Sequence, residues 1–312
     1  EKLWWTDTKN IGFNVNYNIL KKCFKFSNFS YHSNKKVLHF DLSNNRAESV
    51  TFFDFLKKRK YKKKINNLVL SAGAIGSGKI LSNSIYFKNN HKIKLPIMDT
   101  NVLKIPFINL KMIFKKESSS TIPFNRVVSS YLIENLNYPS SIHVEIMTFQ
   151  NLLINDISRK IPFGHKLSNI IASRLSSSLG VASIFLPEKI EDSNYLKLNE
   201  YNNFSYNYKD STHKVKFEKK ISNKIKLFLI KLKCIPIMSL KLTHGSGIHY
   251  AGTIPFGKKD YQLNSSYKIN KFKNVFVGDS SSFPSLPSKS ITFNIVANAI
   301  RVSEKLKKYL ND

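Results

Sequence analysis

Short apolar runs separated by polar turns make up the chain between residues 35 and 70. Val37–Phe40 is apolar and short, Ser43–Arg46 is rich in turn-forming residues, and Ser49–Phe53 is β-prone. Runs of this length, bounded by Asn and Ser, are typical of β-strands joined by turns. Asn67–Leu70 is a further apolar run, and it reads as a buried strand.

Between residues 96 and 240 the pattern changes to a mixture of helix and strand. Ile142–Met147 and Val181–Leu186 read as strands. Gly164–Leu179 predicts a helix, because apolar side chains recur there at helical spacing. Tyr195–Phe217 alternates polar and aromatic residues, as strands at a sheet edge do. The pattern therefore predicts mixed α and β structure, without internal repeats.

The C-terminal segment predicts one amphipathic helix. Ser290 is suited to cap its N-terminus, because a serine side chain can accept a hydrogen bond from the first helical turn. Lysines gather at the C-terminal end, where the helix dipole favours cations. The apolar stripe of the helix consists of Ile291, Ile295, Ala299, Val302 and Leu306. We expect this helix to dock on the body of the protein.

Composition places the chain among folded proteins. Its 312 residues are 42% hydrophobic, enough to bury a sizeable core in one large or two ordinary domains. The formal net charge of +30 would suit nucleic acid or an anionic membrane. The excess is nearly all Lys and is spread along the chain beside abundant Asn, Ile and Phe, as the codons of an AT-rich genome would produce. We therefore expect no specific nucleic-acid partner.

The densest basic cluster is Lys57–Lys64, which resembles a nuclear-localisation or phosphate-binding motif. We interpret it as a solvated hairpin tip before the next strand. Cys23 and Cys234 supply neither a disulfide framework nor metal-ligand spacing, so no metal site is expected. The most apolar stretch, Ile225–Leu240, contains lysines, and no membrane span is expected. A reducing cytoplasm is the simplest compartment.

A glycine-rich segment allows two interpretations. Ser71–Gly78 reads as a small-residue turn before a helix that opens at Ile80. Gly73–Lys79 also satisfies the Gly-x-x-x-x-Gly-Lys spacing of a nucleotide-binding P-loop, and Asp279 could pose as its Mg²⁺-holding acid. However, Ile80 stands where a P-loop requires a Ser or Thr hydroxyl for Mg²⁺. The P-loop is therefore the minor alternative. A second interpretation, given next, explains more of the segment.

Four segments occur in an order and spacing that resemble the glucose–methanol–choline (GMC) flavoprotein oxidoreductases. They are Leu68–Ser77, His249–Pro255, Val275–Pro284 with its Gly-Asp-Ser turn, and the helix Ser290–Arg301. The first looks like the internal strand-and-turn motif of that family, and the others look like its C-terminal region. The run after Ser290 is closest to a bacterial subgroup thought to act on sugars or polyols.

The resemblance implies an α/β fold: part of a Rossmann-like FAD-binding domain plus an inserted α+β substrate domain with an antiparallel sheet. We expect residues 1–93 to be the later part of the FAD-binding domain and residues 94–240 the substrate-binding domain. Residues 241–312 would carry the active-site segment and return to the FAD-binding domain. No Gly-x-Gly-x-x-Gly turn occurs near Glu1. We therefore expect the natural reading frame to continue upstream with that fingerprint.

The resemblance also implies roles for individual residues. His249 would be the general base for an alcohol hydroxyl, and Ser290 a second polar group of the active site. His244 is read as incidental. The residues expected to bind FAD are Ala72, Gly73, Ala74, Gly278, Asp279, Ser280, Ile291 and Thr292. The implied function is oxidation of a small-molecule alcohol, such as a sugar or polyol, with hydride passing to flavin N5 and then to an electron acceptor that the sequence does not identify.

Three alternatives remain open at this point. The chain could be an inactive fragment of a GMC oxidoreductase, because the dinucleotide fingerprint is missing. Less favoured are a P-loop nucleotide-binding protein and a basic nucleic-acid-binding protein.

Overall fold

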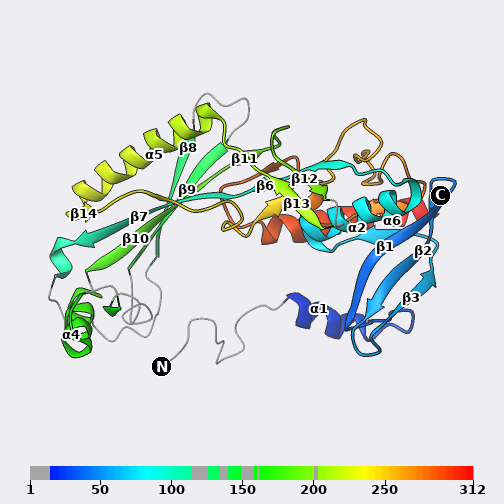
Figure 1. Cartoon of the computed structure of the whole chain (residues 1–312), viewed down its shortest axis with the longest axis horizontal. Helices are drawn as coiled ribbons and strands as arrows, with labels where there is room; N and C mark the ends of the chain where they lie inside the picture. Colours follow the sequence, from blue (N-terminus) through cyan, green and yellow to red (C-terminus); the bar gives the residue numbers. More distant parts are fainter. Residues whose placement is uncertain are drawn as a thin grey trace.

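The computed structural model describes residues 15–113, 126–133, 140–148, 158–159, 162–176, 178–199 and 203–311. It places two regions at opposite ends of an elongated molecule (Figure 1). One end is an antiparallel sheet with helices beside it. The other end is built around a short parallel strand pair, two long helices and a three-stranded sheet. The residues with predicted chemistry lie in and next to the second region.

The larger sheet is antiparallel, and its strands run in the order β14-β7-β10-β9-β8, with β15 also paired to β7. Ile184 lies opposite Leu103 on one neighbouring strand and Val144 on the other, so apolar residues share one face. Helix α5 (Thr212–Lys231) covers that face and contributes Ile221 and Leu229 to the same buried cluster (Figure 1). The strands are β7 (Asn101–Asn109), β8 (Arg126–Ile133), β9 (Ser140–Thr148), β10 (Leu179–Leu186), β14 (Cys234–Pro236) and β15 (Leu240–Lys241).

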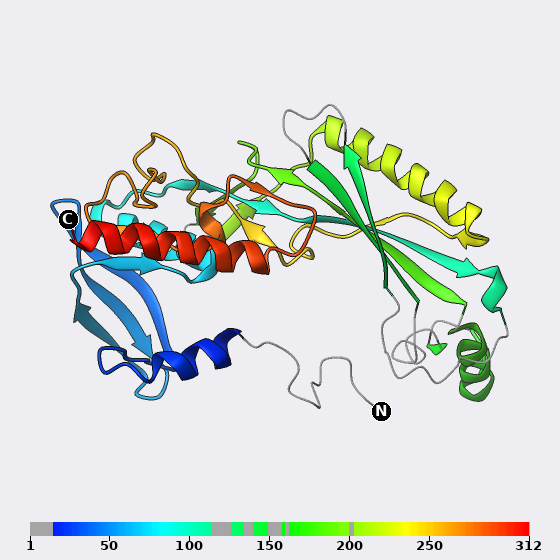
Figure 2. The same ribbon diagram turned by 180° about the vertical axis from the view of Figure 1, so that it is seen from behind.

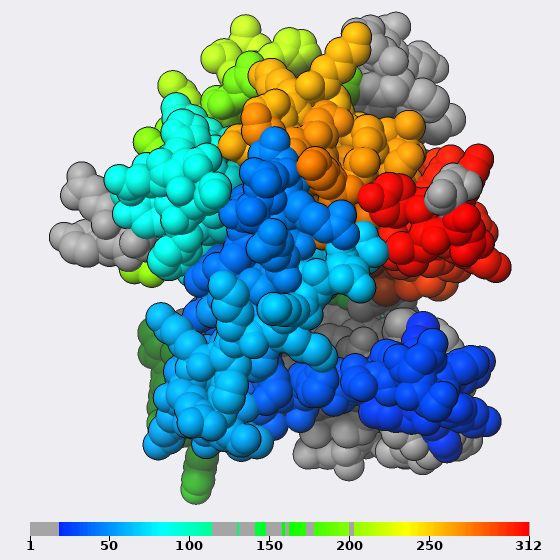
Figure 3. All heavy atoms as spheres, turned by 90° about the vertical axis from the view of Figure 1, so that its right-hand side faces the viewer, coloured from blue at the N-terminus to red at the C-terminus, as the bar shows by residue number. Residues whose placement is uncertain are grey.

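Strands β1 (Lys35–Ser43), β2 (Arg46–Asp54) and β3 (Arg59–Lys64) form a three-stranded antiparallel sheet at the other end. Asn44 and Asn45, both with positive φ, make the turn between β1 and β2. Figure 3 shows this sheet on the surface, with helices α1 (Val15–Cys23) and α6 (Thr292–Asn311) beside it.

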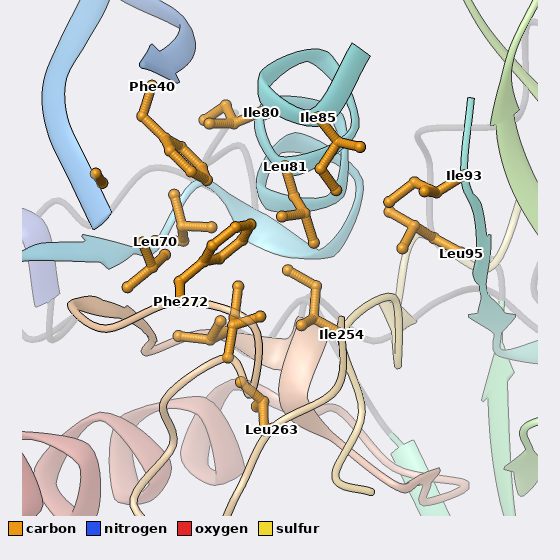
Figure 4. Packing of buried hydrophobic residues seen from close by; sticks show 14 of the residues in the cluster. Phe40, Leu70, Ile80, Leu81, Ile85, Ile93, Leu95, Ile254, Leu263 and Phe272 are labelled. Atoms are coloured by element: carbon orange, nitrogen blue, oxygen red, sulfur yellow. The ribbon is translucent and has the colours of Figure 1, made fainter. Parts of the chain in front are cut away.

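The parallel pair joins β4 (Leu68–Leu70) to β17 (Val275–Val277), although more than 200 residues separate them in the chain. Helix α2 (Gly73–Asn89) follows β4 directly and packs against β1. Small residues of α2, such as Ser77 and Gly78, are buried, which lets neighbouring segments approach the helix closely. Figure 4 shows Leu81, Phe40, Phe272 and Ile254 pointing into the core between these elements.

Short pairings tie the two regions together. β5 pairs with β12 and β12 with β13, β6 with β16, and β11 with β18, all antiparallel. Helix α6 runs along the second region, as the reverse view shows (Figure 2), and α4 (His165–Ser176) lies by the far end of the large sheet. The short elements are β5 (Lys94–Pro96), β6 (Met98–Asp99), η1 (Leu110–Met112), β11 (Glu188–Lys189), β12 (Tyr195–Leu198), β13 (Phe204–Asn207), β16 (Tyr250–Ala251), η2 (Ser280–Ser282) and β18 (Ser285–Leu286).

Several boundaries differ from the sequence-based expectation. The turn after β4 is confined to Ser71 and Ala72, because α2 already begins at Gly73, where a buried carboxylate accepts its first N–H. Lys57–Lys64 is mostly strand: β3 pairs with β2 along its whole length, and only the residues before Arg59 form the turn. Only the end of Tyr195–Phe217 is helical, from Thr212, where Ser211 caps α5.

The C-terminal helix also begins later than predicted. It starts at Thr292, so Ser290 precedes it and lies outside the capping position, and the main-chain oxygen of Ile291 accepts the bond from Ile295 N at 2.9 Å. Ala299 is exposed, and Asn298 takes the buried position next to it. The face of α6 that packs on the protein therefore includes a polar residue, Asn298, which forms hydrogen bonds with the segment under the helix.

Candidate active site

The carboxyl ends of the parallel strands are joined by hydrogen bonds around one buried carboxylate. Gly278 N donates to Leu70 O at 2.9 Å and extends the pairing by one step. Asp279 follows and is 5% exposed. Its Oδ2 accepts from Gly73 N at 2.9 Å and from Ser77 Oγ at 2.5 Å. Its Oδ1 accepts from Ser281 N at 2.9 Å and from the hydroxyl of the same serine. A negative charge at the first N–H of α2 also suits the helix dipole.

The segment that carries His249 lies directly on these strand ends. Gly252 N donates to Ser280 O at 3.0 Å, and Ser280 Oγ donates to Tyr250 O at 2.9 Å. Thr253 Oγ1 donates to Ala74 O at 2.7 Å and so fastens the segment to the first turn of α2. Gly252 has φ of +78°, and a Cβ there would lie 2.5 Å from Met98 Cε. Only glycine fits this turn.

The start of α6 completes the group. Ile291 is 4% exposed and belongs to a small apolar cluster with Met98, Ala251 and Leu286. Asn298 Nδ2 donates to Ser282 Oγ at 3.2 Å and holds the helix on η2. Ser290 and Thr292 are exposed, with their hydroxyl oxygens 3.4 Å apart. The structure thus brings all four predicted segments together at one place, while their roles in binding and catalysis stay predictions.

His249 itself is half-buried and follows Ile248, which has φ of +54°. Its main-chain oxygen accepts from Thr100 N at 3.2 Å, which places the histidine beside the start of β7. Its Nδ1 is buried and has no hydrogen-bond partner among the described residues. Most buried polar atoms in folded proteins have a hydrogen-bond partner, either a protein group or an ordered water.

Asp99 lies across the β6–β16 ladder from Tyr250, the residue after His249. It is 5% exposed, and burial raises the pKa of its carboxyl despite the opposing effects of Gly245 N–H and of nearby His244, His249 and Lys214. Its Oδ2 accepts from Gly245 N at 2.6 Å. Its Oδ1 is buried without a partner among the described residues. Sequence reasoning missed this residue, because nothing local to Asp99 signals that a distant loop wraps around it.

Beyond Asp99 lies a network of partly buried ion pairs. Asp210 carboxylate oxygens lie 3.2 Å from Lys214 Nζ, 2.6 Å from Lys241 Nζ and 3.1 Å from His244 Nε2. Lys241 Nζ also pairs with Glu218 at 2.9 Å, and Lys214 pairs with Glu188. His244 is therefore an ion-pair partner within a network, whereas the sequence interpretation treated it as incidental.

Burial and charge act against each other in this network. Burial raises the pKa of Glu188 to about 7, although the Lys214 ammonium opposes it. Burial alone would lower the pKa of Lys214, but Glu188, Tyr208 and Asp210 outweigh it, so the lysine stays charged. Burial would raise the pKa of Asp210, and Lys241 and Lys214 hold it below the usual aspartate value instead. Lys214 therefore stays charged, and the pKa of Glu188 lies near neutral pH.

A groove of about 520 Å³ runs beside β4 and the first turns of α2. Its lining includes Ala72, Gly76 and the lysines Lys35, Lys36 and Lys79. Open space also borders Gly73, because a Cβ built there would meet no atom within 4 Å. An extended anionic ligand would find both room and positive charge along this side of the strand pair.

The P-loop alternative does not fit this geometry. Gly73–Lys79 lies inside α2, whereas a P-loop wraps around phosphate before its helix begins. Asp279 uses both carboxylate oxygens on protein donors. In the part of the chain that the structure describes, no group of three His, Cys, Asp or Glu side chains could hold a metal, and no helix is long and apolar enough to cross a membrane.

Solved structures provide the comparison with known proteins. An FAD-dependent oxidoreductase from Chaetomium thermophilum matches with a TM-score of 0.57 and 13% identity over 95% of this chain. Pyridoxine 4-oxidase from Mesorbium loti matches with a TM-score of 0.51 and 14% identity over 89% of the chain. A formate oxidase variant from Aspergillus oryzae matches with a TM-score of 0.59 and 11% identity over 88% of the chain.

The chain shares its fold with FAD-dependent oxidoreductases. This agrees with the mixed α/β class and the antiparallel sheets that the sequence predicted. The chain spans 64%, 57% and 60% of the lengths of the three proteins, respectively. No family model matches the sequence, and no curated protein matches it. At these identities the likeness concerns the fold, and the choice among family, subgroup and substrate remains a matter for proposal.

Proposed function

We propose that the chain is part of a GMC-type, FAD-dependent oxidoreductase that oxidises an alcohol, with His249 as general base. One observation carries the proposal: segments 71–74, 249–253, 278–280 and 290–292 converge at the carboxyl ends of the parallel strands β4 and β17. Ligands of open α/β sheets bind at such ends. In this proposal residues 1–93 and 241–312 belong to a Rossmann-like FAD-binding domain. Residues 94–240 form the inserted substrate domain, built on the antiparallel sheet.

The residues present suit FAD in three respects. The groove beside β4 offers lysines for phosphate oxygens, with Ala72 in its lining. The exposed start of α6 presents helix N–H groups, which favour a ligand edge that carries negative charge. Gly73 borders open space, so a ligand can approach its backbone. Asp279 acts through the turn Gly278–Ser280 that it holds, because its own oxygens are already occupied.

When bound, FAD supplies the hydride acceptor. The chain supplies the proton acceptor and the positioning. His249 in its neutral form takes the proton of the substrate hydroxyl, since an imidazole titrates near working pH. Its buried Nδ1 leaves Nε2 as the nitrogen for this task. Ser290, exposed at the start of α6, would orient the substrate hydroxyl, and the N–H groups of Ile291 and Thr292 would help to hold the flavin. A sugar or polyol is the proposed substrate class.

The test is stopped-flow reduction of the flavin-loaded protein by alcohols. His249→Ala is expected to leave the flavin spectrum intact and to slow flavin reduction by about 10²–10⁴-fold, the usual contribution of a general base. The reduction rate should also lose the limb that rises with pH, because neutral imidazole is the active form. Ser290→Ala should cost less, because a short hydroxyl mainly orients.

Two results would reject this assignment. Unchanged reduction in His249→Ala, together with a larger loss in Ser290→Ala, would reverse the two roles. Loss of flavin from His249→Ala would make the histidine structural. His244→Ala is the matched control, because His244 lies in the same loop but is paired with Asp210. It should retain most of the reduction rate.

A further inference from the structure

Asp99 and His249 each carry one buried polar atom that the fold leaves without a partner. These atoms are Asp99 Oδ1 and His249 Nδ1, which have no hydrogen-bond partner among the described residues. The two residues are held close by the backbone: Asp99 lies opposite Tyr250 in the β6–β16 ladder, and Thr100 N donates to His249 O at 3.2 Å. A buried carboxylate oxygen and a buried imidazole nitrogen therefore belong to neighbouring segments, and the two groups interact electrostatically.

The loop before His249 wraps around the same carboxylate. Gly245, at φ of +94°, donates its N–H to Asp99 Oδ2 at 2.6 Å. A Cβ at Gly247 would lie 2.8 Å from Asp99 Oδ1 and 2.1 Å from Thr100 O. Both glycines are thus needed for the loop to close over Asp99. At Gly247 the loop comes close enough to bury Asp99 Oδ1 but gives this oxygen no hydrogen-bond donor. This contact therefore has little structural purpose.

The other titratable groups around Asp99 already have partners of their own. The titratable groups that face Asp99 are His244, His249, Tyr250, Tyr208 and Lys214. Lys214 already pairs with Glu188 and Asp210, and His244 pairs with Asp210 and stacks on Tyr208 with ring centroids 4.3 Å apart. Tyr208 donates to the main-chain oxygen of Asp99, and Tyr250 donates to Gly245 O. Only the His249 imidazole in this set has no ion-pair or side-chain hydrogen-bond partner among the described residues.

We propose that Asp99 is the counter-charge and positioning residue of His249. Its carboxylate holds the loop through Gly245, and it stabilises the imidazolium that forms when His249 accepts a proton. The idea rests on the proposed function only for the source of that proton, which is the substrate hydroxyl. The electrostatic coupling itself is a property of this chain, and it can be measured without flavin.

The experiment follows histidine titration by NMR in the full chain labelled at histidine. His249→Gln identifies the resonances of His249. In Asp99→Asn the titration midpoint of His249 should fall by about one pH unit or more, because an adjacent opposite charge shifts such a midpoint by about 1–3 units. Asp210→Asn is the matched control: it should move the midpoint of His244, its partner at 3.1 Å, and leave His249 nearly unchanged.

A His249 midpoint that moves no further in Asp99→Asn than in Asp210→Asn would overturn the proposal. Should Asp99→Asn not fold, the wild-type chain answers the same question, because coupling is reciprocal. The carboxyl resonance of Asp99 should then show a second inflection at the His249 midpoint. A curve without that inflection would also overturn the proposal.

A second readout concerns the reaction. In flavin-loaded protein, the limb of flavin reduction that rises with pH should move to lower pH in Asp99→Asn, by the interval seen in the NMR titration. If the midpoint shifts but no alcohol reduces the flavin in any variant, the counter-charge stands and the proposed function fails. If reduction occurs with an unshifted limb, the proposed function stands and Asp99 is a structural residue.

Discussion

The molecule contains two acidic centres whose carboxylates are stabilised in different ways. At the end of β17, Asp279 is surrounded by neutral donors, two main-chain N–H groups and two serine hydroxyls. Near the start of α5, Asp210, Glu188 and Glu218 are balanced by the ammonium groups of Lys214 and Lys241. The first centre joins the end of β17 to α2 and η2. The second joins the large sheet to α5 and to the loop before His249.

The two centres therefore differ in whether the groups around the carboxylates can change charge with pH. Neutral donors have no charge to lose in the physiological range, so the donors around Asp279 form a rigid joint. Ion pairs retain a dependence on protonation, and Glu188, with a pKa of about 7, is poised to change charge. His249 lies between the two, anchored on the rigid joint through Tyr250 and Gly252 and facing the charged network through Asp99.

The largest expected effect comes from breaking the rigid joint. Asp279→Ala leaves the buried hydroxyl of Ser77 and the buried N–H and hydroxyl of Ser281 without their acceptor. Unsatisfied buried donors and the lost charge-assisted bonds together should lower the free energy of unfolding by about 3–5 kcal/mol. Urea unfolding followed by circular dichroism measures this loss.

Asp260→Ala is the control for Asp279→Ala. Asp260 is 62% exposed and pairs with Lys271 at 2.9 Å, so its loss should cost about 0–1 kcal/mol. Similar losses in the two variants would show that the carboxylate of Asp279 contributes no more than a surface ion pair, and the comparison of the two centres would collapse.

The charged network should make the free energy of unfolding depend on pH. Burial raises the pKa of Glu188 to about 7 in the folded chain, above the 4.5 of an unperturbed glutamate. The folded state therefore binds more protons than the unfolded state in this window. Stability from Glu188 is fully present below pH 4.5 and is lost as pH rises through about 7, by an upper bound of about 3 kcal/mol.

Glu188→Gln resembles the protonated form and should remove this slope. Unfolding free energies of wild type and Glu188→Gln should be similar below pH 4.5, with the variant gaining on the wild type up to about pH 7 and keeping that advantage at higher pH. Glu304→Gln, exposed on α6, should follow the wild type at every pH. A wild type that gains stability relative to Glu188→Gln with rising pH would mean that the Lys214 pair outweighs burial.

The two centres also differ in how far the sequence predicts them. The motifs around Asp279 are local and ordered, so the strand ends, the turn at Gly278 and the helix after Ser290 follow from composition and spacing. What spacing did not show is that Asp279 bonds to α2, since Gly73 lies 206 residues away. The sequence also predicted the start of α2 too late. A run of glycine and serine has no helical periodicity, and only its tertiary contacts show that it is helical.

The charged network was not predicted at all. Its members come from β11, α5, β15 and the segment before α5, and each looks like one more charge in a chain with 50 Lys and Arg. Burial alone distinguishes Lys214 from the exposed lysines, and burial depends on the large sheet being assembled. Asp99 was missed for the same reason. The His249 motif could be found from its neighbours in sequence, whereas its surroundings could be found only from the fold.

The smallest expected effect concerns the anchor of the His249 segment on the rigid joint. Thr253→Val keeps the shape of the side chain and removes the bond from Thr253 Oγ1 to Ala74 O. Because Ala74 O lies in the first turn of α2 and the lost bond is a single neutral one, the free energy of unfolding should fall by about 1 kcal/mol.

Thr243→Val tests the same chemistry without the anchor. Thr243 is exposed and its hydroxyl lies 2.9 Å from Ser246 Oγ, in the loop held by Asp99, so the variant should lose at most a few tenths of a kcal/mol. The two variants should also differ in the histidine NMR spectrum. Thr253 fixes the strand that carries His249 to α2, so its loss should broaden or shift the His249 resonances, while Thr243→Val should affect His244 first. The opposite pattern would mean that His249 is positioned by the loop and Asp99 alone, and that the rigid joint contributes only to stability.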